Sequence, residues 1–215
     1  LGHRADEIKK FVDKTFRGIR VTYVINDRYR ETNTGYSLML ASEAIGTAEF
    51  VKFDADVVFD VKILRQLLDS DHANVLCIDR NIALEDEEVK VIANDQMQVL
   101  EVGKSVDPKR ALGESIGVVK ISAGTGARLF VELSEMMESR GNLEAYYEAA
   151  YAQLVDKGTQ FHALDISGLD WTEIDTAIDF AAANAVFGSP VTTISRSQQK
   201  VLDEAAEEAA IHTHV

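Results

Sequence analysis

The sequence has 215 residues, 46% of them hydrophobic and 27% charged, which is the balance of a folded domain rather than of a disordered chain. Its net charge of −14 excludes nucleic-acid binding through a basic face, although a metal ion and a few lysines can still hold an anionic substrate. With no membrane-length apolar run, no secretory signal and a single Cys77 in an apolar run, we expect a cytoplasmic protein that binds neither nucleic acid nor membranes.

Short β-type runs alternate with longer helical stretches along most of the chain. In chain order, the pattern predicts a helix over 8–16, a strand over 19–25, a helix over 36–45, a strand within 50–59, a helix over 61–68, a strand over 73–78, a hairpin over 89–102, a strand over 115–122, helices over 127–139 and 143–155, a strand over 160–166 and a helix over 176–185. Strands separated by helices indicate an α/β fold. We expect a mostly parallel mixed sheet with helices on both faces and the hairpin as an antiparallel insertion.

A linker-like stretch over 188–193 divides the chain into a domain over 1–187 and a linker with a polar C-terminal helix over 188–215. That helix, over 195–211, suits a capping element, a homodimer contact or the start of a second domain. The chain begins at Leu1 in a helix, without the strand and phosphate loop that normally start a parallel α/β sheet. We therefore expect a phosphate-loop segment before Leu1, and an open groove in the sheet beside Asp56 in its absence.

Two carboxylates, Asp54 and Asp56, follow an apolar strand and lie at the edge where open α/β sheets bind ligands. Alternate residues of a strand share a face, so both side chains can point the same way. Neighbouring carboxylates repel each other unless a cation lies beside them, and their hard oxygen atoms suit Mg²⁺. A solvated acidic turn, with Asp60 capping the next helix, explains the same spacing equally well.

A second acidic cluster, Glu173 and Asp175, flanks the apolar Ile174. The alternation turns both carboxylates away from the apolar side. Taken alone, this spacing favours a helix that is capped at Asp175.

Further short motifs occur in a fixed order along the chain. They are Asn26, Tyr29, Thr32–Thr34, Ser37–Leu38 and Ala41, then Asp56–Asp60, Glu88–Val91, Gly103–Lys104, Gly113–Gly117 and Glu173–Thr176. Over about residues 2–183, their order and spacing resemble the nucleotidyltransferase superfamily of sugar-phosphate pyrophosphorylases and small-molecule cytidylyltransferases. The most similar branch includes the phosphocholine, inositol-phosphate and aminoethylphosphonate cytidylyltransferases. The resemblance implies a Rossmann-like, GT-A-like fold and a requirement for Mg²⁺.

The resemblance also assigns roles to single residues. Asp56 and Asp175 would share one Mg²⁺, Lys104 would hold the substrate phosphate, and these three would be the catalytic residues. The residues expected on the nucleotide side are Asn26, Thr32, Asn33, Ser37 and Asp54. Those expected on the substrate side are Glu114, Trp171 and Glu173. Tyr146, Tyr147 and Glu148 suit a cationic amine head group, although core packing explains the tyrosines better.

The activity implied is transfer of a nucleotidyl group, CMP from CTP, to a phosphorylated or phosphonate small molecule, with release of pyrophosphate. Such chemistry needs no protein nucleophile, and the sequence contains no Ser-His-Asp or Cys-His set. Gly103 stands where sugar-specific members carry a glutamate, which favours a phospho-alcohol or phosphonate over a sugar phosphate. The alternatives are a sugar-1-phosphate nucleotidyltransferase and a non-catalytic nucleotide-binding or regulatory subunit.

Overall fold

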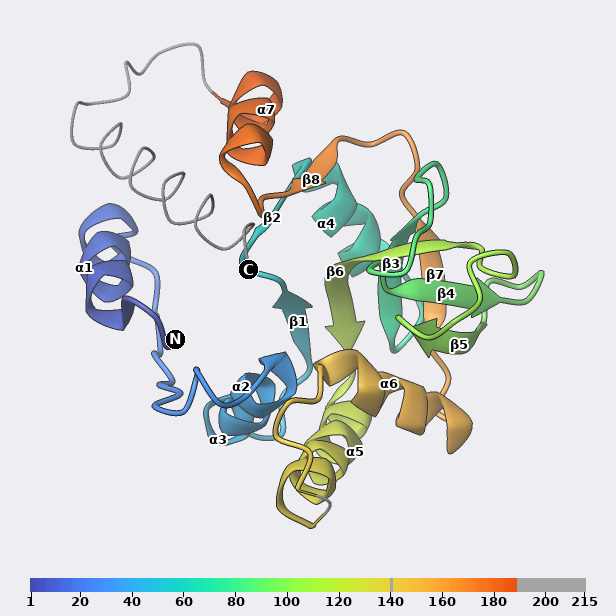
Figure 1. Cartoon of the computed structure of the whole chain (residues 1–215), viewed down its shortest axis with the longest axis horizontal. Helices are drawn as coiled ribbons and strands as arrows, with labels where there is room; N and C mark the ends of the chain where they lie inside the picture. The colour runs from blue at the N-terminus through green and yellow to red at the C-terminus, as the bar shows by residue number, and fades with distance from the viewer. Residues whose placement is uncertain (140, 189–215) are drawn as a thin grey trace, which may run out of the picture.

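The computed structural model describes residues 1–139 and 141–188 (Figure 1). In chain order the elements are α1 (Ala5–Thr15), α2 (Thr34–Leu40), α3 (Ser42–Ile45), β1 (Phe50–Phe53), β2 (Val57–Phe59), α4 (Val61–Asp69), β3 (Val75–Asp79), β4 (Lys90–Ala93), β5 (Val99–Gly103), β6 (Gly113–Ile121), α5 (Ala123–Ser134), the π-helical turn η1 (Glu135–Ser139), α6 (Tyr147–Asp156), β7 (His162–Asp165), β8 (Trp171–Glu173) and α7 (Ala177–Phe187). The helix predicted over 195–211 lies outside the described residues, as do linker residues 189–193.

The main sheet has the strand order β5-β4-β6-β3-β7, with β1 also paired to β6, and a two-stranded sheet joins β2 to β8. The α/β class and the mixed sheet are confirmed, but the pairing is mostly antiparallel rather than mostly parallel. In the described residues only β3 and β7 are parallel, whereas β6 runs against β1, β3 and β4. The reason is the path of the chain, because β3 ends and β6 begins at the same edge, where Asp79 pairs with Glu114.

Helices cover both faces of this sheet, as predicted. All five residues of β3 are buried, and successive side chains point to opposite faces. Leu76 and Ile78 pack into the core beneath α5 and α6. Val75 and Cys77 pack into a second core beneath α4. Burial raises the pKa of the Cys77 thiol to about 12, so this cysteine is a buried apolar residue rather than a nucleophile.

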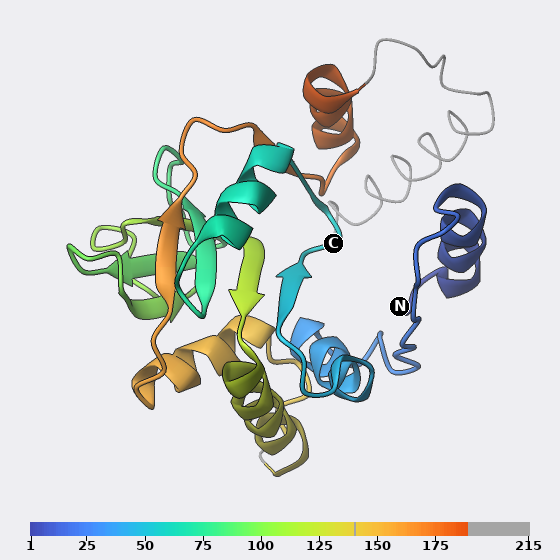
Figure 2. The ribbon, with the colours of Figure 1, turned by 180° about the vertical axis from the view of Figure 1, so that it is seen from behind.

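The strand predicted over 19–25 is wrong, because these residues carry no helix or strand. Figures 1 and 2 show α1 and this segment standing apart from β1. A β-branched run becomes a strand only when it pairs and packs, and within the described residues β1 makes its ladder with β6. Helix α1 is present as predicted, but none of its residues is buried.

Two predicted elements are each divided in two, and one strand was missed. The helix predicted over 36–45 is α2 and α3, and the strand predicted within 50–59 is β1 and β2. The break between β1 and β2 matters, because β1 pairs with β6 while β2 pairs with the unpredicted β8. The acidic residues between β1 and β2 therefore lie where the two sheets meet.

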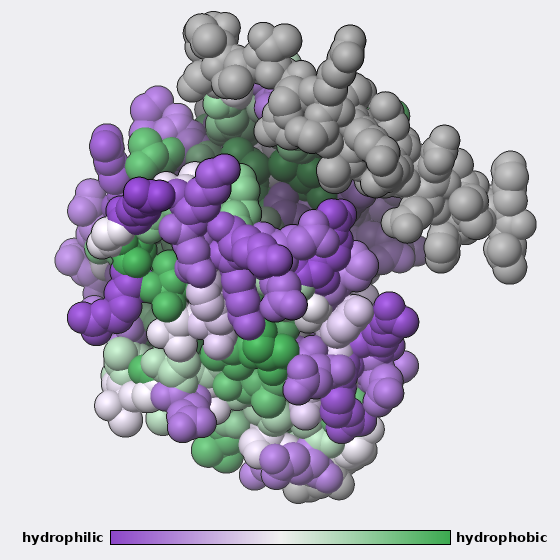
Figure 3. All heavy atoms as spheres, turned by 90° about the vertical axis from the view of Figure 1, so that its left-hand side faces the viewer, coloured by the Kyte–Doolittle hydropathy of each residue, from purple (hydrophilic) through white to green (hydrophobic). Residues whose placement is uncertain are grey.

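One face of the molecule shows how polar and apolar side chains are distributed over its surface. Figure 3 shows the side of the molecule that carries α1, where polar and charged side chains alternate with patches of hydrophobic ones. In the part of the chain that the structure describes, no helix is both long and apolar enough to span a membrane.

Candidate active site

A pocket of about 190 Å³ lies beside β6, at the point where this strand changes its partner. Along one edge, β4 pairs with the first two residues of β6 and β1 pairs with its last four. The backbone between them, Ser115–Gly117, lines the pocket. The acidic side chains of its walls are Asp54, Asp56, Glu87, Glu88, Glu114, Glu148 and Glu173. The other candidate residues on the walls are Lys104, Tyr146, Tyr147 and Trp171.

The structure brings Asp56 and Asp175 together, with Glu173 as a third member of the cluster. One carboxylate oxygen from each of the three lies within 4.8 Å of the other two. Pairing of β2 with β8 produces this approach, since Val57 lies opposite Glu173 and the Ile174 N–H donates to the Asp56 carbonyl at 2.9 Å. Burial and the nearby acidic groups Asp175 and Asp56 raise the pKa of Glu173.

Three such carboxylates fit Mg²⁺, which prefers oxygen ligands and leaves several positions to water and phosphate. All three side chains are exposed, so an ion here stays accessible to a phosphate ligand. Their role as metal ligands stays a prediction. Glu173, expected on the substrate side, lies with the two predicted metal aspartates.

The backbone of Asp175 is held by the start of α7. The predicted helix cap at Asp175 is wrong, because Thr176 is the N-cap. Its hydroxyl accepts from the Asp179 N–H, and the Asp179 carboxylate accepts from the N–H groups of Thr176 and Asp175, at 2.8 and 3.3 Å. This capping box fixes the helix start and leaves the Asp175 carboxylate free of the capping role.

Asp54 belongs to a half-buried network at the pocket, which is called the pocket floor below. Its carboxylate lies 2.7 Å from the Lys52 Nζ and accepts from the Tyr147 hydroxyl at 2.5 Å. The Lys52 Nζ also lies 3.3 Å from the centroid of the Tyr147 ring. Gly117, with φ of 73°, leaves the space that the Asp54 carboxylate occupies. The structure thus gives Asp54 protein partners; its predicted place beside the nucleotide stays a prediction.

Burial lowers the pKa of Lys52, and the Asp54 carboxylate only partly offsets this effect. Replacing Lys52 with methionine leaves Asp54 without its cation, and we expect the unfolding free energy to fall by about 3 kcal/mol. Denaturant unfolding measures this loss. The matched control is Lys62→Met, which removes the exposed pair with Asp60 and should cost less than about 1 kcal/mol. Equal losses of unfolding free energy in the two variants would contradict the stabilising role of the Lys52–Asp54 pair.

Lys104 lines the same pocket, as its predicted role requires. Its Nζ lies 3.2 Å from the Glu87 carboxylate and 4.9 Å from the centroid of the Tyr146 ring. Partial burial lowers its pKa, but the Glu87 hydrogen bond and nearby negative groups outweigh this, so the net shift is upward. Lys104 therefore carries a full positive charge at the pocket wall.

The substrate-side candidates Glu114 and Trp171 also face the pocket. Burial, followed by repulsion from Glu88, Glu173 and Asp79, raises the pKa of Glu114 to about 7. The Trp171 indole N–H donates to the Asp79 carboxylate at 2.8 Å, which fixes the ring. With a pKa of about 7, the Glu114 carboxyl is close to half-ionised at neutral pH.

Tyr146 and Tyr147 lie in different environments, and the prediction that at least one of them packs in the core is confirmed. Tyr147 is buried and Tyr146 is exposed on the pocket wall. One oxygen of Glu148, Oε2, is buried and has no hydrogen-bond partner within the described residues. Burial is the main cause that raises the pKa of Glu148.

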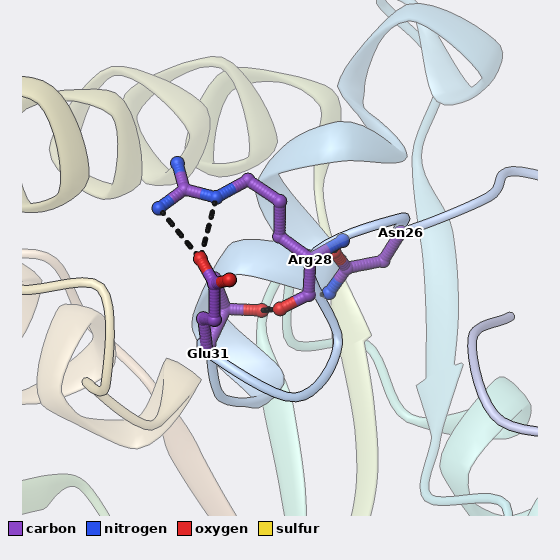
Figure 4. Close-up of polar contacts among 4 residues, drawn as sticks. Asn26, Arg28 and Glu31 are labelled. Atoms are coloured by element: carbon purple, nitrogen blue, oxygen red, sulfur yellow. Dashed lines mark hydrogen bonds and ion pairs between the residues drawn. The ribbon is translucent and has the colours of Figure 1, made fainter.

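The four nucleotide-side candidates within residues 26–37 mainly hold the turn before α2 and the start of that helix. The Asn26 side-chain amide donates to Thr32 Oγ1 and Ser37 Oγ, at 2.9 and 3.0 Å, and Asn33 caps α2. Figure 4 shows Arg28 reaching Glu31 across the same turn, beside Asn26. Thr34, the first residue of α2, lines the pocket, whereas Asn26, Thr32, Asn33 and Ser37 are not among its lining residues. Their contact with a nucleotide stays a prediction.

Two lysines that the sequence reading missed support the pocket. Lys52 holds the floor, and the fully buried Lys90 donates to the carbonyls of Glu85, Asp86 and Glu88, at 2.8 to 3.1 Å. These bonds hold the acidic loop that brings Glu87 to Lys104. The available signal was a lysine inside the apolar run 89–92.

No protein-family model matches the chain. The chain is 26% identical over 212 residues to the CMP-5'-(3-aminopropyl)phosphonate synthase of Streptomyces rubellomurinus. The match covers 94% of this chain, which spans about a third (32%) of the length of that curated relative.

Solved structures share the fold. The inositol-1-phosphate CTP transferase of T. maritima has a TM-score of 0.70 and 17% identity, covering 89% of this chain and 76% of that one. The CTP:phosphocholine cytidylyltransferase of Streptococcus pneumoniae has a TM-score of 0.67 and 20% identity, with 84% and 74% covered. A UDP-glucose pyrophosphorylase has a TM-score of 0.64 and 14% identity, with 86% and 78% covered. The curated match and the shared fold agree with the resemblance of the motifs to the nucleotidyltransferase superfamily.

Proposed function

We propose that the chain transfers CMP from CTP to a small molecule that carries a phosphate or phosphonate group and a cationic amine, with release of pyrophosphate. The observation that carries the proposal is a single pocket. Two carboxylates of the cluster, Asp56 and Glu173, line it, Lys104 lies on its wall, and acidic and aromatic side chains line the rest. The choice of cytidine is supported by the curated relative and by two of the similar structures, whose names state CMP or CTP.

The reaction divides its demands among these side chains. Asp56, Glu173 and Asp175 would hold Mg²⁺, which supplies charge neutralisation for the triphosphate. Lys104 would bind and orient the acceptor phosphate or phosphonate by charge-assisted hydrogen bonds. One acceptor oxygen then forms a bond to the α-phosphorus of CTP as the bond to pyrophosphate breaks, in line. Positioning and charge account for the catalysis, and the chain supplies no nucleophile.

The proposal that the acceptor carries a cationic amine is supported by the excess of negative charge in the pocket. Glu148 Oε2 is buried without a partner in the described residues, and Glu114 is held partly neutral by burial and by its acidic neighbours. Unpartnered buried carboxylates destabilise a site unless a ligand satisfies them. An ammonium group supplies both charge and hydrogen-bond donors, and the Tyr146 and Trp171 rings supply faces that attract a cation.

A pyrophosphate-release assay on the intact protein tests the proposal, crossing four nucleoside triphosphates with matched acceptors. The acceptors are an aminoalkyl phosphonate, the alkyl phosphonate of equal length without the amine, phosphocholine and glucose 1-phosphate. We expect kcat/KM to be highest with CTP and the amine-bearing acceptors. Preference for glucose 1-phosphate would indicate a sugar-phosphate nucleotidyltransferase, and no turnover with any pair would indicate a non-catalytic subunit.

The pKa of Glu114 predicts a pH dependence for the amine. Below about pH 7 the carboxyl is neutral, and above it the carboxylate attracts an ammonium group. KM for the amine-bearing phosphonate should therefore fall as pH rises toward 7. The pH at the midpoint of this fall should be lower when Mg²⁺ is bound, because a nearby cation favours the ionised form of Glu114.

The alkyl phosphonate without the amine is the control, because it corrects for titration of the phosphonate itself. The ratio of the two KM values should lose its pH dependence in Glu114→Gln. A ratio that changes equally with pH in the variant and the unaltered protein would contradict the role of Glu114.

We place this reaction in the cytoplasm, without a nucleic-acid or membrane partner. The net charge of −14 and the buried thiol of Cys77 support this placement. A homodimer remains a proposal, which size-exclusion chromatography with light scattering tests.

A further inference from the structure

A second hollow, of about 470 Å³, lies at the opposite edge of the main sheet. In Figure 2, β6 runs down into α5 and β7 runs up from the segment after α6, so the end of β6 and the start of β7 lie at the same end of the sheet, on either side of β3. Ser122, just after β6, lines this hollow, whereas Ile116 in β6 lines the candidate active site. At the rise of a strand, these two positions lie roughly 20 Å apart. The two sites are therefore separate.

The lining of this hollow differs from the rest of the molecule in charge. The whole chain carries 36 Asp and Glu residues against 22 Lys and Arg. Among the described residues that line the hollow, however, none is an Asp or Glu. The polar side chains that matter here are His72, Asn74, Gln98, Arg128, Gln160 and His162. A basic, amide-rich surface on a strongly acidic protein is suited to an anion.

His72 and His162 form a stacked pair on the wall of this hollow. Their ring centroids lie 3.7 Å apart and their planes differ by 16°. Burial, followed by the proximity of His72, lowers the pKa of His162. Two imidazoles this close resist carrying a charge together unless an anion lies beside them.

The charged groups near the pair come from α5, from β6 and from the segment between α4 and β3. Arg128 of α5 lines the hollow, and its guanidinium is held at the first turn of that helix by the Gly124 carbonyl and the Thr125 hydroxyl. Lys120 of β6 donates to the Ser70 carbonyl at 2.6 Å, two residues before His72. Asp71 is the carboxylate next to His72 in the chain.

Asn74 keeps this edge rigid. It is buried, its side-chain oxygen accepts from the N–H and hydroxyl of Ser122, and its amide donates to the Gln160 carbonyl at 3.0 Å. These bonds join the start of β3 to the start of α5 and to the segment before β7. The basic side chains therefore stand on a fixed frame rather than on a loose loop.

We propose that this hollow is a second ligand site, which binds the phosphate group of a small anion between Arg128 and the His72–His162 pair. The Gln98 and Gln160 side chains offer amide donors on the same wall. An anion that neutralises the pair binds the protonated imidazoles more tightly than the neutral ones. Binding must then raise the pKa of His162, by linkage.

The test follows the imidazole protons of His162 by NMR in the intact protein, titrated with inorganic phosphate at constant ionic strength. We expect saturable shifts at millimolar phosphate and a rise in the pKa of His162. Arg128→Gln should weaken binding about tenfold, which is the loss of one charge-assisted hydrogen bond of about 1.4 kcal/mol. Arg128 is exposed, so the variant is expected to fold and to keep its nucleotidyltransfer activity.

Two comparisons complete the experiment. Asp56→Asn alters the candidate active site and should leave the phosphate response of His162 unchanged. Adenosine monophosphate replaces phosphate in a second titration: a response to phosphate indicates a free anion, and a response to the nucleotide alone indicates a phosphate ester as the source. If neither ligand shifts His162, or if Arg128→Gln responds as the unaltered protein does, the proposed site is wrong.

Discussion

Replacing Asp56 with asparagine is expected to lower kcat by about 10²–10³-fold, the scale on which charge-stabilising groups act in transition states. The asparagine keeps the shape of the side chain and removes one negative charge from the cluster with Glu173 and Asp175. The Mg²⁺ concentration needed for half-maximal activity should rise at the same time, because two carboxylates hold the ion less tightly than three. Steady-state pyrophosphate release at varied Mg²⁺ measures both effects.

Stability provides the control for this variant. The Asp56 side chain is exposed beside two other carboxylates, so removing its charge relieves repulsion and should not lower the unfolding free energy measured without metal. Asp170→Asn, which alters an exposed carboxylate outside the cluster, should keep its kcat. An Asp56→Asn variant with normal kcat at saturating Mg²⁺ would remove Asp56 from the mechanism.

The Lys104→Ala variant should raise KM for the phosphorylated acceptor by about 10–100-fold, since a hydrogen bond to a charged group contributes about 1.5–3 kcal/mol. KM for the triphosphate should change by no more than about threefold if that ligand is bound mainly through the carboxylate cluster and its metal. Initial rates with each substrate varied in turn separate the two effects. An equal rise in both KM values would mean that Lys104 serves the nucleotide.

Glu87 provides a matched variant, because its carboxylate is the present partner of the Lys104 amine at 3.2 Å. An acceptor phosphate must displace or share this contact. Glu87→Gln weakens the competitor and keeps the side-chain shape, so KM for the acceptor should stay the same or fall. A large rise would show instead that Glu87 helps to position Lys104 for the substrate.

The parts of the fold that depend on local pattern were predictable from the sequence. Helix α4 follows from apolar residues one helical turn apart, such as Ile63 and Leu67, which are both buried. The strand expected over 19–25 has the right residue types but depends on a partner that local pattern does not reveal. The missed strand β8 is short, and it exists because it pairs with β2, which lies more than a hundred residues earlier.

In the candidate site, the approach of the acidic residues was predictable from the sequence, whereas the side chains that support them were not. The resemblance predicted that Asp56 and Asp175 approach each other, and the structure shows that approach together with Glu173. The supporting lysines were not predicted, because the roles of Lys52 and Lys90 depend on burial and on the distant groups that they contact. A lysine in a strand is normally read as solvent-facing, and the apolar neighbours of Lys90 in the run 89–92 are only a weak signal that its side chain is enclosed.

Gly117 limits the ways in which this pocket can diversify. Its positive φ suits glycine, and a Cβ there would collide with the Asp54 carboxylate. Any larger residue would displace Asp54 and with it the contacts to Lys52 and Tyr147. The floor can therefore change only by several simultaneous substitutions, whereas exposed wall positions such as Tyr146 and Glu87 can change singly. Directed evolution toward new acceptors should accumulate its first successful substitutions on that wall and leave the floor intact.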